Sequence, residues 1–177
     1  MSTSAPKQWS SAPAMTVDVA KKYSASIQTS KGTMVAELFV ADAPKTVNNF
    51  VFLSSQKFYD GVVFHRIIRD FMVQTGDPQG TGMGGPGYRF ADEPVKRQYV
   101  RGTLAMANSG PNTSGSQFFI VHKDYPLPPN YTIFGVVTQG LDVLDAIATT
   151  PVRANLYGEP SQPAERVTIQ SVTITAQ

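Results

Sequence analysis

The sequence of 177 residues contains no cysteine. Disulfide bridges, thiol nucleophiles, cysteine-ligated zinc and iron–sulfur clusters are therefore excluded. Only two histidines occur, His65 and His122, which excludes a metal site built mainly from imidazoles. Charged residues make up 16% of the chain, and the net charge of +2 is too small for a dedicated nucleic-acid surface. Whatever reaction the chain supports must use few ionisable side chains.

Long apolar runs are also missing, since no stretch approaches the ~20 apolar residues of a membrane-spanning helix. We therefore expect no membrane association. The first residues are rich in Ser, Ala and Pro, and no apolar run typical of a secretory signal follows Lys7. We expect a cytoplasmic protein with an N-terminal extension at residues 1–20 and a single domain at residues 21–177. The extension is either a flexible leader or is docked through Trp9, the only tryptophan.

What the sequence does contain is a series of short strand patterns. Apolar and polar residues alternate from Tyr23 onward, and with the turn at residues 30–32 they predict a β-hairpin. Helical spacing occurs over residues 43–55, with Asp42 as the expected N-cap, and over residues 141–148. Further strands are expected at residues 62–68, 71–75, 103–107, 117–121, 132–137 and 167–174. About eight strands and two helices without a βαβ alternation favour an antiparallel barrel or sandwich with both helices outside.

Two sequence motifs resemble known functional patterns in their residue types but lack the local structure that those functions require. Residues 80–85 have the spacing G-x-G-x-x-G, but Pro86 and Gly87 follow where a nucleotide-binding fold requires a helix. Ser114 and Ser116 lie near glycines, yet neither forms the G-x-S-x-G turn of a serine hydrolase. Neither nucleotide binding nor serine hydrolysis is therefore favoured.

Isolated ionisable residues have simple structural interpretations. Asp77, Asp92 and Glu93 could together hold a cation, but turn and loop carboxylates are the simpler interpretation. His122 lies at the end of an expected strand, and we expect a solvated loop residue. His65 lies within an apolar strand, where a histidine satisfied by hydrogen bonds is expected more than a proton-transfer catalyst.

Arg66 is the most informative single residue. It lies in the middle of an expected strand with apolar neighbours on both sides. An arginine in that position must be ion-paired, or kept at a partly dry surface for a ligand. The sequence leaves both alternatives open.

Apolar and amide side chains alternate in the strands expected to follow Arg66. Phe71, Met72 and Gln74 belong to one strand, and Gln117 and Phe119 share one face of another. Brought together, they would form an apolar pocket with a few donors at its rim, as in a groove for a peptide or small molecule. Core packing alone remains an alternative for each aromatic residue taken singly.

The segments FHRIIRDFMVQTGD and LAMANSGPNTSGSQFFI resemble the two signature segments of the cyclophilin family of peptidyl-prolyl cis/trans isomerases. The resemblance continues through APKTVNNFVFL, FYDGV, GTGMGGPGYRFADE and YTIFG, and covers residues 23–175. It implies a mainly β fold, a closed eight-stranded antiparallel β-barrel capped by two α-helices. It also implies prolyl isomerase activity that assists protein folding, in a compact, bacterial-like member of the family. The expected partners are proline-containing polypeptides, bound by a monomer that needs no cofactor and no metal.

The resemblance also implies roles for individual residues. Arg66 matches the catalytic arginine of the family. The walls of the proline pocket are matched by Phe71, Met72, Phe119 and Leu127, with Tyr131 where a histidine is common at the pocket edge. The groups that hold the substrate backbone are matched by Gln74, Gln117 and the backbone at Ala107 and Asn108.

One departure from the family pattern concerns the rim of the pocket. Well-known members carry a tryptophan immediately before the leucine matched by Leu127, whereas Tyr125-Pro126 stand here. Because that tryptophan supports cyclosporin binding, we expect weakened affinity for cyclosporin while catalysis on proline survives. The alternative function is a proline-peptide binding or scaffold module with little turnover. Retention of Arg66 argues against it, because binding alone would tolerate loss of the arginine.

Overall fold

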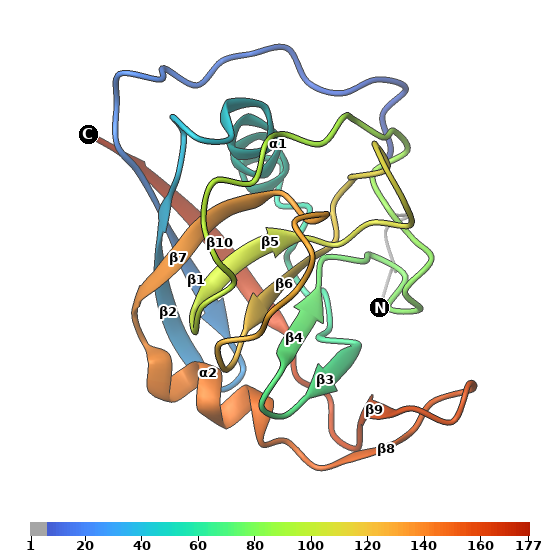
Figure 1. The fold of residues 1–177 in the computed structure, drawn as a ribbon. Helices are drawn as coiled ribbons and strands as arrows, with labels where there is room; N and C mark the ends of the chain where they lie inside the picture. The colour runs from blue at the N-terminus through green and yellow to red at the C-terminus, as the bar shows by residue number, and fades with distance from the viewer. Residues whose placement is uncertain (1–6) are drawn as a thin grey trace.

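The computed structural model describes residues 7–177, and its main feature is one curled antiparallel sheet with a helix at each end (Figure 1). The eight strands of this sheet follow the order β10-β1-β2-β7-β5-β6-β4-β3. They are β1 (Tyr23–Thr29), β2 (Gly32–Leu38), β3 (Arg66–Ile68), β4 (Met72–Thr75), β5 (Thr103–Met106), β6 (Phe118–Val121), β7 (Ile133–Gln139) and β10 (Ile169–Ala176). The predicted mainly β architecture with two helices is confirmed.

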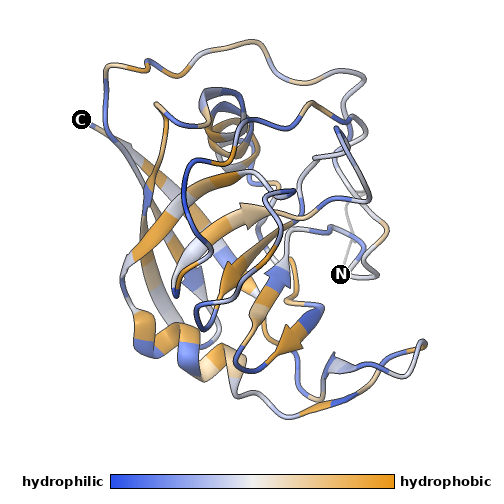
Figure 2. Ribbon diagram, viewed as in Figure 1, coloured by the Kyte–Doolittle hydropathy of each residue, from blue (hydrophilic) through white to orange (hydrophobic). Residues whose placement is uncertain are grey.

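The core lies inside the curl of the sheet, where hydrophobic residues are concentrated along the strands (Figure 2). Strand alternation explains which side chains point inward: Ala25 and Ile27 of β1 are 0% exposed, while the alternating Ser24 and Ser26 are partly exposed. The pattern in the sequence that predicted the first hairpin is therefore the pattern of burial.

The two helices are α1 (Pro44–Ser55) and α2 (Leu141–Ala148), as the spacing of apolar residues predicts. Phe50 of α1 packs against Phe118 and Phe134 with ring centroids 5.4 and 5.3 Å apart. Within residues 7–177, neither helix is long and apolar enough to cross a membrane.

The expected N-cap of α1 is wrong. The N-cap residue is Ala43, which offers no side-chain hydrogen bond, and Asp42 instead pairs with Arg97 at 2.8 Å. Glu93, from a loop distant in sequence, accepts a hydrogen bond from the Thr46 N–H at the start of the helix. Periodicity located the helix, but the capping group comes from tertiary structure.

The expectation of a closed barrel is also wrong in one respect. Strands β3 and β10 form the two edges of the sheet and do not pair as a ladder. An isolated bridge between Val63 and Thr168, with a 2.8 Å hydrogen bond from the Phe64 N–H to the Val167 carbonyl, connects them. Because the strand expected at residues 62–68 becomes regular only from Arg66 onward, the consecutive pairs needed for closure are absent between β3 and β10 in the described residues.

A second, two-stranded sheet was not predicted. Strands β8 (Val152–Ala154) and β9 (Pro160–Pro163) form a hairpin that projects beside β3 (Figure 1). All three residues of β8 are exposed, and prolines begin and end β9. Neither segment therefore shows the alternation that marks a half-buried strand.

The N-terminal extension passes over α1 without forming a helix or strand in residues 7–22 (Figure 1); residues 1–6 of the predicted extension lie outside the described residues. Trp9 packs on Phe52 and Phe58, with ring centroids 5.1 and 5.9 Å away. Its backbone N–H donates to the Pro86 carbonyl at 2.9 Å. On these contacts we propose that Trp9 anchors the extension.

Candidate active site

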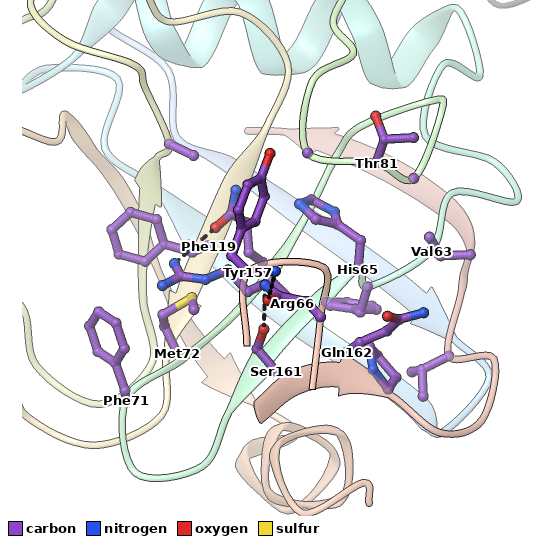
Figure 3. A pocket seen from close by; sticks show the side chains of 18 of the residues that line it. Val63, His65, Arg66, Phe71, Met72, Thr81, Phe119, Tyr157, Ser161 and Gln162 are labelled. Carbon is purple, nitrogen blue, oxygen red and sulfur yellow. Dashed lines mark hydrogen bonds between the residues drawn. The ribbon is translucent and has the colours of Figure 1, made fainter. Parts of the chain in front are cut away.

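A cavity of about 920 Å³ lies along β3, β4 and β6 and extends to the β8–β9 hairpin. Figure 3 shows Phe71 and Met72 on one side of this pocket and His65 and Val63 on the other, with Arg66 between them. All but one of the expected site residues line it, namely Arg66, Phe71, Met72, Gln74, Ala107, Asn108, Phe119, Leu127 and Tyr131. Gln117 lines an adjoining pocket instead.

Strand register explains how residues far apart in sequence meet. Arg66 of β3 is paired with Gln74 of β4, and Gln74 is paired with Phe119 of β6. Paired residues on neighbouring strands point to the same face and lie ~5 Å apart. The three side chains therefore form a row across the edge of the sheet.

The Arg66 guanidinium is held by two side chains. Its Nε and Nη2 donate to the two carboxylate oxygens of Glu159 at 2.8 and 3.0 Å, and its Nη1 donates to Gln74 Oε1 at 3.4 Å. The two sequence alternatives for this arginine therefore coincide, since Arg66 is ion-paired and also faces the pocket.

Glu159 is the site residue that the sequence reasoning missed. It lies between β8 and β9, where no strand pattern announces the hairpin. Hydrogen bonds from Arg66 and Ser161 lower the pKa of the Glu159 carboxyl to about 2, against the smaller effect of burial. The pair with Arg66 is therefore ionic at neutral pH.

Gln117, which lines the adjoining pocket, accepts a hydrogen bond from Gln74. Gln74 Nε2 donates to Gln117 Oε1 at 3.0 Å, and Gln117 Nε2 donates to the carbonyls of Gly82 and Gly84 at 3.0 and 2.9 Å. A continuous chain of side-chain hydrogen bonds thus leads from Glu159 through Arg66 to the glycine-rich loop.

That loop, part of the glycine-rich residues 76–94, is organised by one buried carboxylate. Asp77 is 0% exposed, and its oxygens accept hydrogen bonds from the backbone N–H groups of Gln79, Thr81, Gly82 and Gly84. Burial alone would raise the pKa of Asp77, but these backbone donors together lower it. A Cβ at Gly84 would clash with Asp77 Oδ1, which explains the glycine. Asp77 thus has the role of a turn carboxylate.

The apolar wall of the pocket is built from aromatic contacts. The rings of Phe119 and Tyr131 meet edge to face with centroids 5.6 Å apart. The ring of Phe71 lies against Tyr125, with centroids 4.3 Å apart. Tyr125 therefore extends the aromatic wall outward. It lies one residue before Pro126, the position at which well-known members of the family carry a tryptophan.

Both histidine interpretations made from sequence are wrong. His65 lines the pocket, and neither ring nitrogen has a hydrogen-bond partner in residues 7–177. His122 is 8% exposed rather than solvated. Its Nδ1 accepts from the Asp70 N–H at 2.9 Å, so its Nε2 carries the proton directed at Asp145 Oδ1, also at 2.9 Å. These contacts join the β3–β4 turn to α2, which the local sequence could not indicate.

Comparison with known proteins agrees with this geometry. A family model described as "Cyclophilin type peptidyl-prolyl cis-trans isomerase/CLD" matches residues 24–174. Peptidyl-prolyl cis-trans isomerase-like 3 of Gallus gallus is 46% identical over 156 residues, covering 85% of this chain and 94% of the relative. Probable peptidyl-prolyl cis-trans isomerase B of Mycobacterium tuberculosis is 45% identical over 168 residues, covering 85% of this chain. This chain spans about half of that relative, 54% of its length.

Solved structures show the same similarity. A crystal structure of a cyclophilin type peptidyl-prolyl cis-trans isomerase of Cryptosporidium parvum has 35% sequence identity and a TM-score of 0.81, covering 88% of this chain and 99% of that one. A second structure of that protein, solved in the presence of the dipeptide Ala-Pro, has a TM-score of 0.80, covering 87% of this chain and 99% of that one. Because the family model covers most of the chain and these relatives are 45–46% identical to it, this chain belongs to the cyclophilin-type peptidyl-prolyl cis-trans isomerase family.

Proposed function

We propose that this protein catalyses cis/trans isomerisation of X–Pro peptide bonds in polypeptides and so assists protein folding. The observation that carries the proposal is the Arg66 guanidinium, oriented at an apolar pocket by Glu159 and Gln74. The occupant of the pocket would be the proline ring of a polypeptide. The Cryptosporidium relative crystallised in the presence of Ala-Pro supports this substrate class.

The chemistry of Arg66 follows from the nature of the barrier. Rotation about an X–Pro bond is opposed by amide resonance, with a barrier of about 20 kcal/mol. Twisting the bond localises a lone pair on the prolyl nitrogen. A fixed guanidinium can donate to that nitrogen only as planarity is lost, so it stabilises the transition state more than either ground state. An acceleration of about 10⁵ requires roughly 7 kcal/mol of such preferential stabilisation.

The remaining site residues would hold one side of the X–Pro bond in place while the other side rotates. Phe119, Met72 and Leu127 supply an apolar surface for the proline ring. Within the described residues, the Asn108 N–H and C=O make no backbone hydrogen bond, whereas the Ala107 N–H donates to Gln117 O at 3.0 Å. The backbone at Asn108 is therefore available to the flanking peptide. Holding one side while the other turns lowers the entropy cost of reaching the twisted state.

Arg66→Ala tests this proposal. We expect kcat/KM on a short X–Pro peptide, measured by exchange NMR without a protease, to fall at least ~100-fold. Arg69→Ala is the matched control, since Arg69 is exposed in the turn after β3. An Arg66→Ala protein with wild-type kcat/KM and an unchanged melting curve would refute the role of Arg66. Wild-type protein that binds the peptide without turnover would favour the scaffold alternative.

We also propose that the protein acts as a monomer in the cytoplasm. Three of the exposed large hydrophobic side chains in the described residues, Met83, Leu156 and Tyr157, line the candidate pocket, and the others come from separate segments of the chain. Scattered apolar residues are typical of a surface without a large obligate interface. Sedimentation of the purified protein and fractionation of cells test these two statements.

A further inference from the structure

Glu159 contacts the pocket residue Arg66, and the family resemblance assigned it no role. It reaches Arg66 from outside the main sheet, on the β8–β9 hairpin. Both side chains are about one-third exposed, at 35% for Arg66 and 34% for Glu159. An ion pair this exposed adds little to stability. Its geometry therefore calls for an explanation other than folding.

The turn that carries Glu159 is rigidly built. Asn155 Oδ1 accepts the backbone N–H groups of Tyr157 and Glu159 at 2.9 and 3.0 Å. The Asn155 N–H in turn donates to the Glu159 carbonyl at 2.8 Å. Ser161, just beyond, is 1% exposed. The carboxylate is therefore presented from a fixed backbone rather than from a freely moving loop.

The contact with Arg66 is bidentate and uses one edge of the guanidinium. Glu159 accepts from Nε and Nη2, so the plane of the group is set by two nearly parallel bonds. Together with the longer bond from Nη1 to Gln74, these contacts leave other N–H donors of Nη1 and Nη2 without a partner in residues 7–177. The remaining N–H of Nη2 lies at the end of the guanidinium opposite to its carbon stem, because the other N–H of Nη2 is directed at Glu159 beside Nε.

We propose that Glu159 is a positioning residue for catalysis, holding the Arg66 guanidinium so that its remaining donors face the prolyl nitrogen. The inference rests on the proposed role of Arg66. An arginine side chain free in solution samples many rotamers, and fixing it only in the transition state would cost entropy. Because the ion pair with Glu159 fixes the Arg66 side chain before substrate binds, this entropy is already lost in the free folded protein. The β8–β9 hairpin then contributes to catalysis by holding Glu159 against Arg66.

The test compares Glu159→Ala and Glu159→Gln with wild type and with Glu37→Gln, which removes an exposed carboxylate on β2. We expect kcat to fall about tenfold in Glu159→Ala, and less in Glu159→Gln, which keeps one acceptor. KM should stay within about twofold, because ground-state binding relies on the apolar pocket. Glu37→Gln should match wild type.

A spectroscopic readout separates positioning from general stability. In wild type, the Arg66 Nε–H resonance in a ¹⁵N spectrum should be protected from solvent exchange. In Glu159→Ala that protection should be lost while the melting curve stays unchanged. Lost protection together with reduced kcat supports the proposal. Unchanged or increased kcat in Glu159→Ala, or reduced kcat with protection retained, overturns it. If Arg66→Ala is itself fully active, the proposed function of Arg66 fails, whatever the Glu159 variants show.

Discussion

Glu93 Oε1 accepts hydrogen bonds from both the backbone N–H and the hydroxyl of Thr46, each at 2.7 Å. The other carboxylate oxygen accepts from the Lys45 N–H at 3.2 Å. These donors belong to the first turn of α1, where backbone N–H groups have no partner within the helix. A carboxylate there also interacts favourably with the helix dipole. Glu93 thus fixes the start of α1 from a loop 47 residues further along the chain than Thr46.

Replacing Glu93 should destabilise the protein. We expect Glu93→Ala to lower the free energy of unfolding by roughly 1–2 kcal/mol, because fully buried Thr46 loses its partner. Asp42→Ala is the control, since its ion pair with Arg97 is partly exposed and should contribute less than about 1 kcal/mol. Urea denaturation measures both. A larger loss in Asp42→Ala than in Glu93→Ala would contradict this assignment of the cap.

The contrast between Asp42 and Glu93 shows where sequence reasoning stops. Helix α2 occupies residues 141–148 as predicted, and α1 begins one residue after the predicted start. Both depend on periodicity, which is local. The capping partner of α1 depends on a loop 47 residues away from Thr46, and no local pattern encodes that contact.

The residues of the candidate site also fall into those that the sequence could predict and those that it could not. Arg66, Gln74 and Phe119 could be placed together because strand alternation and the family signature both mark them. Glu159 could not, because the hairpin that carries it combines exposed residues with Pro160 and Pro163. The surroundings of His122 were missed for a related reason, since its partners come from a turn and a helix distant in sequence.

Removing the anchor of the N-terminal extension should lower stability. Trp9 is half-buried against Phe52 and Phe58, and we expect Trp9→Ala to cost about 1–3 kcal/mol, seen as a lower melting temperature. Deleting residues 1–18 should have at least the same effect. Met15→Ala is the control, because Met15 is 49% exposed. A melting temperature that does not change on deletion would show that the extension is a passive leader.

Cyclosporin should bind weakly. The aromatic wall ends at Tyr125, which lies on Phe71, and exposed Pro126 occupies the position immediately before Leu127. We expect Pro126→Trp to tighten binding at least ~10-fold by adding an aromatic surface at the rim. Calorimetric titration of both proteins measures this, with isomerase activity as the check on folding. Low-nanomolar affinity in wild type would contradict the role given to the missing tryptophan.

His65 should make stability depend on pH in the neutral to mildly acidic range. Burial lowers its pKa from 6.5, an effect that nearby Asp77 opposes and Arg66 reinforces. The unfolded chain therefore takes up this proton at a higher pH than the folded protein does. The part of the stability that depends on neutral His65 is present above the ordinary pKa of 6.5 and is lost as the pH falls below that value toward the lowered pKa of the folded protein.

Carboxylates do not obscure this window. The pKa values of Asp145 and Glu159 are lowered to about 2, so their contributions are lost only as the pH falls below their ordinary values of 3.8 and 4.5. We expect His65→Phe, which has no titrating group, to lose less stability than wild type between pH 7 and pH 5. Urea denaturation at the two pH values gives the difference, and equal losses in the two proteins would show that His65 titrates alike when folded and unfolded.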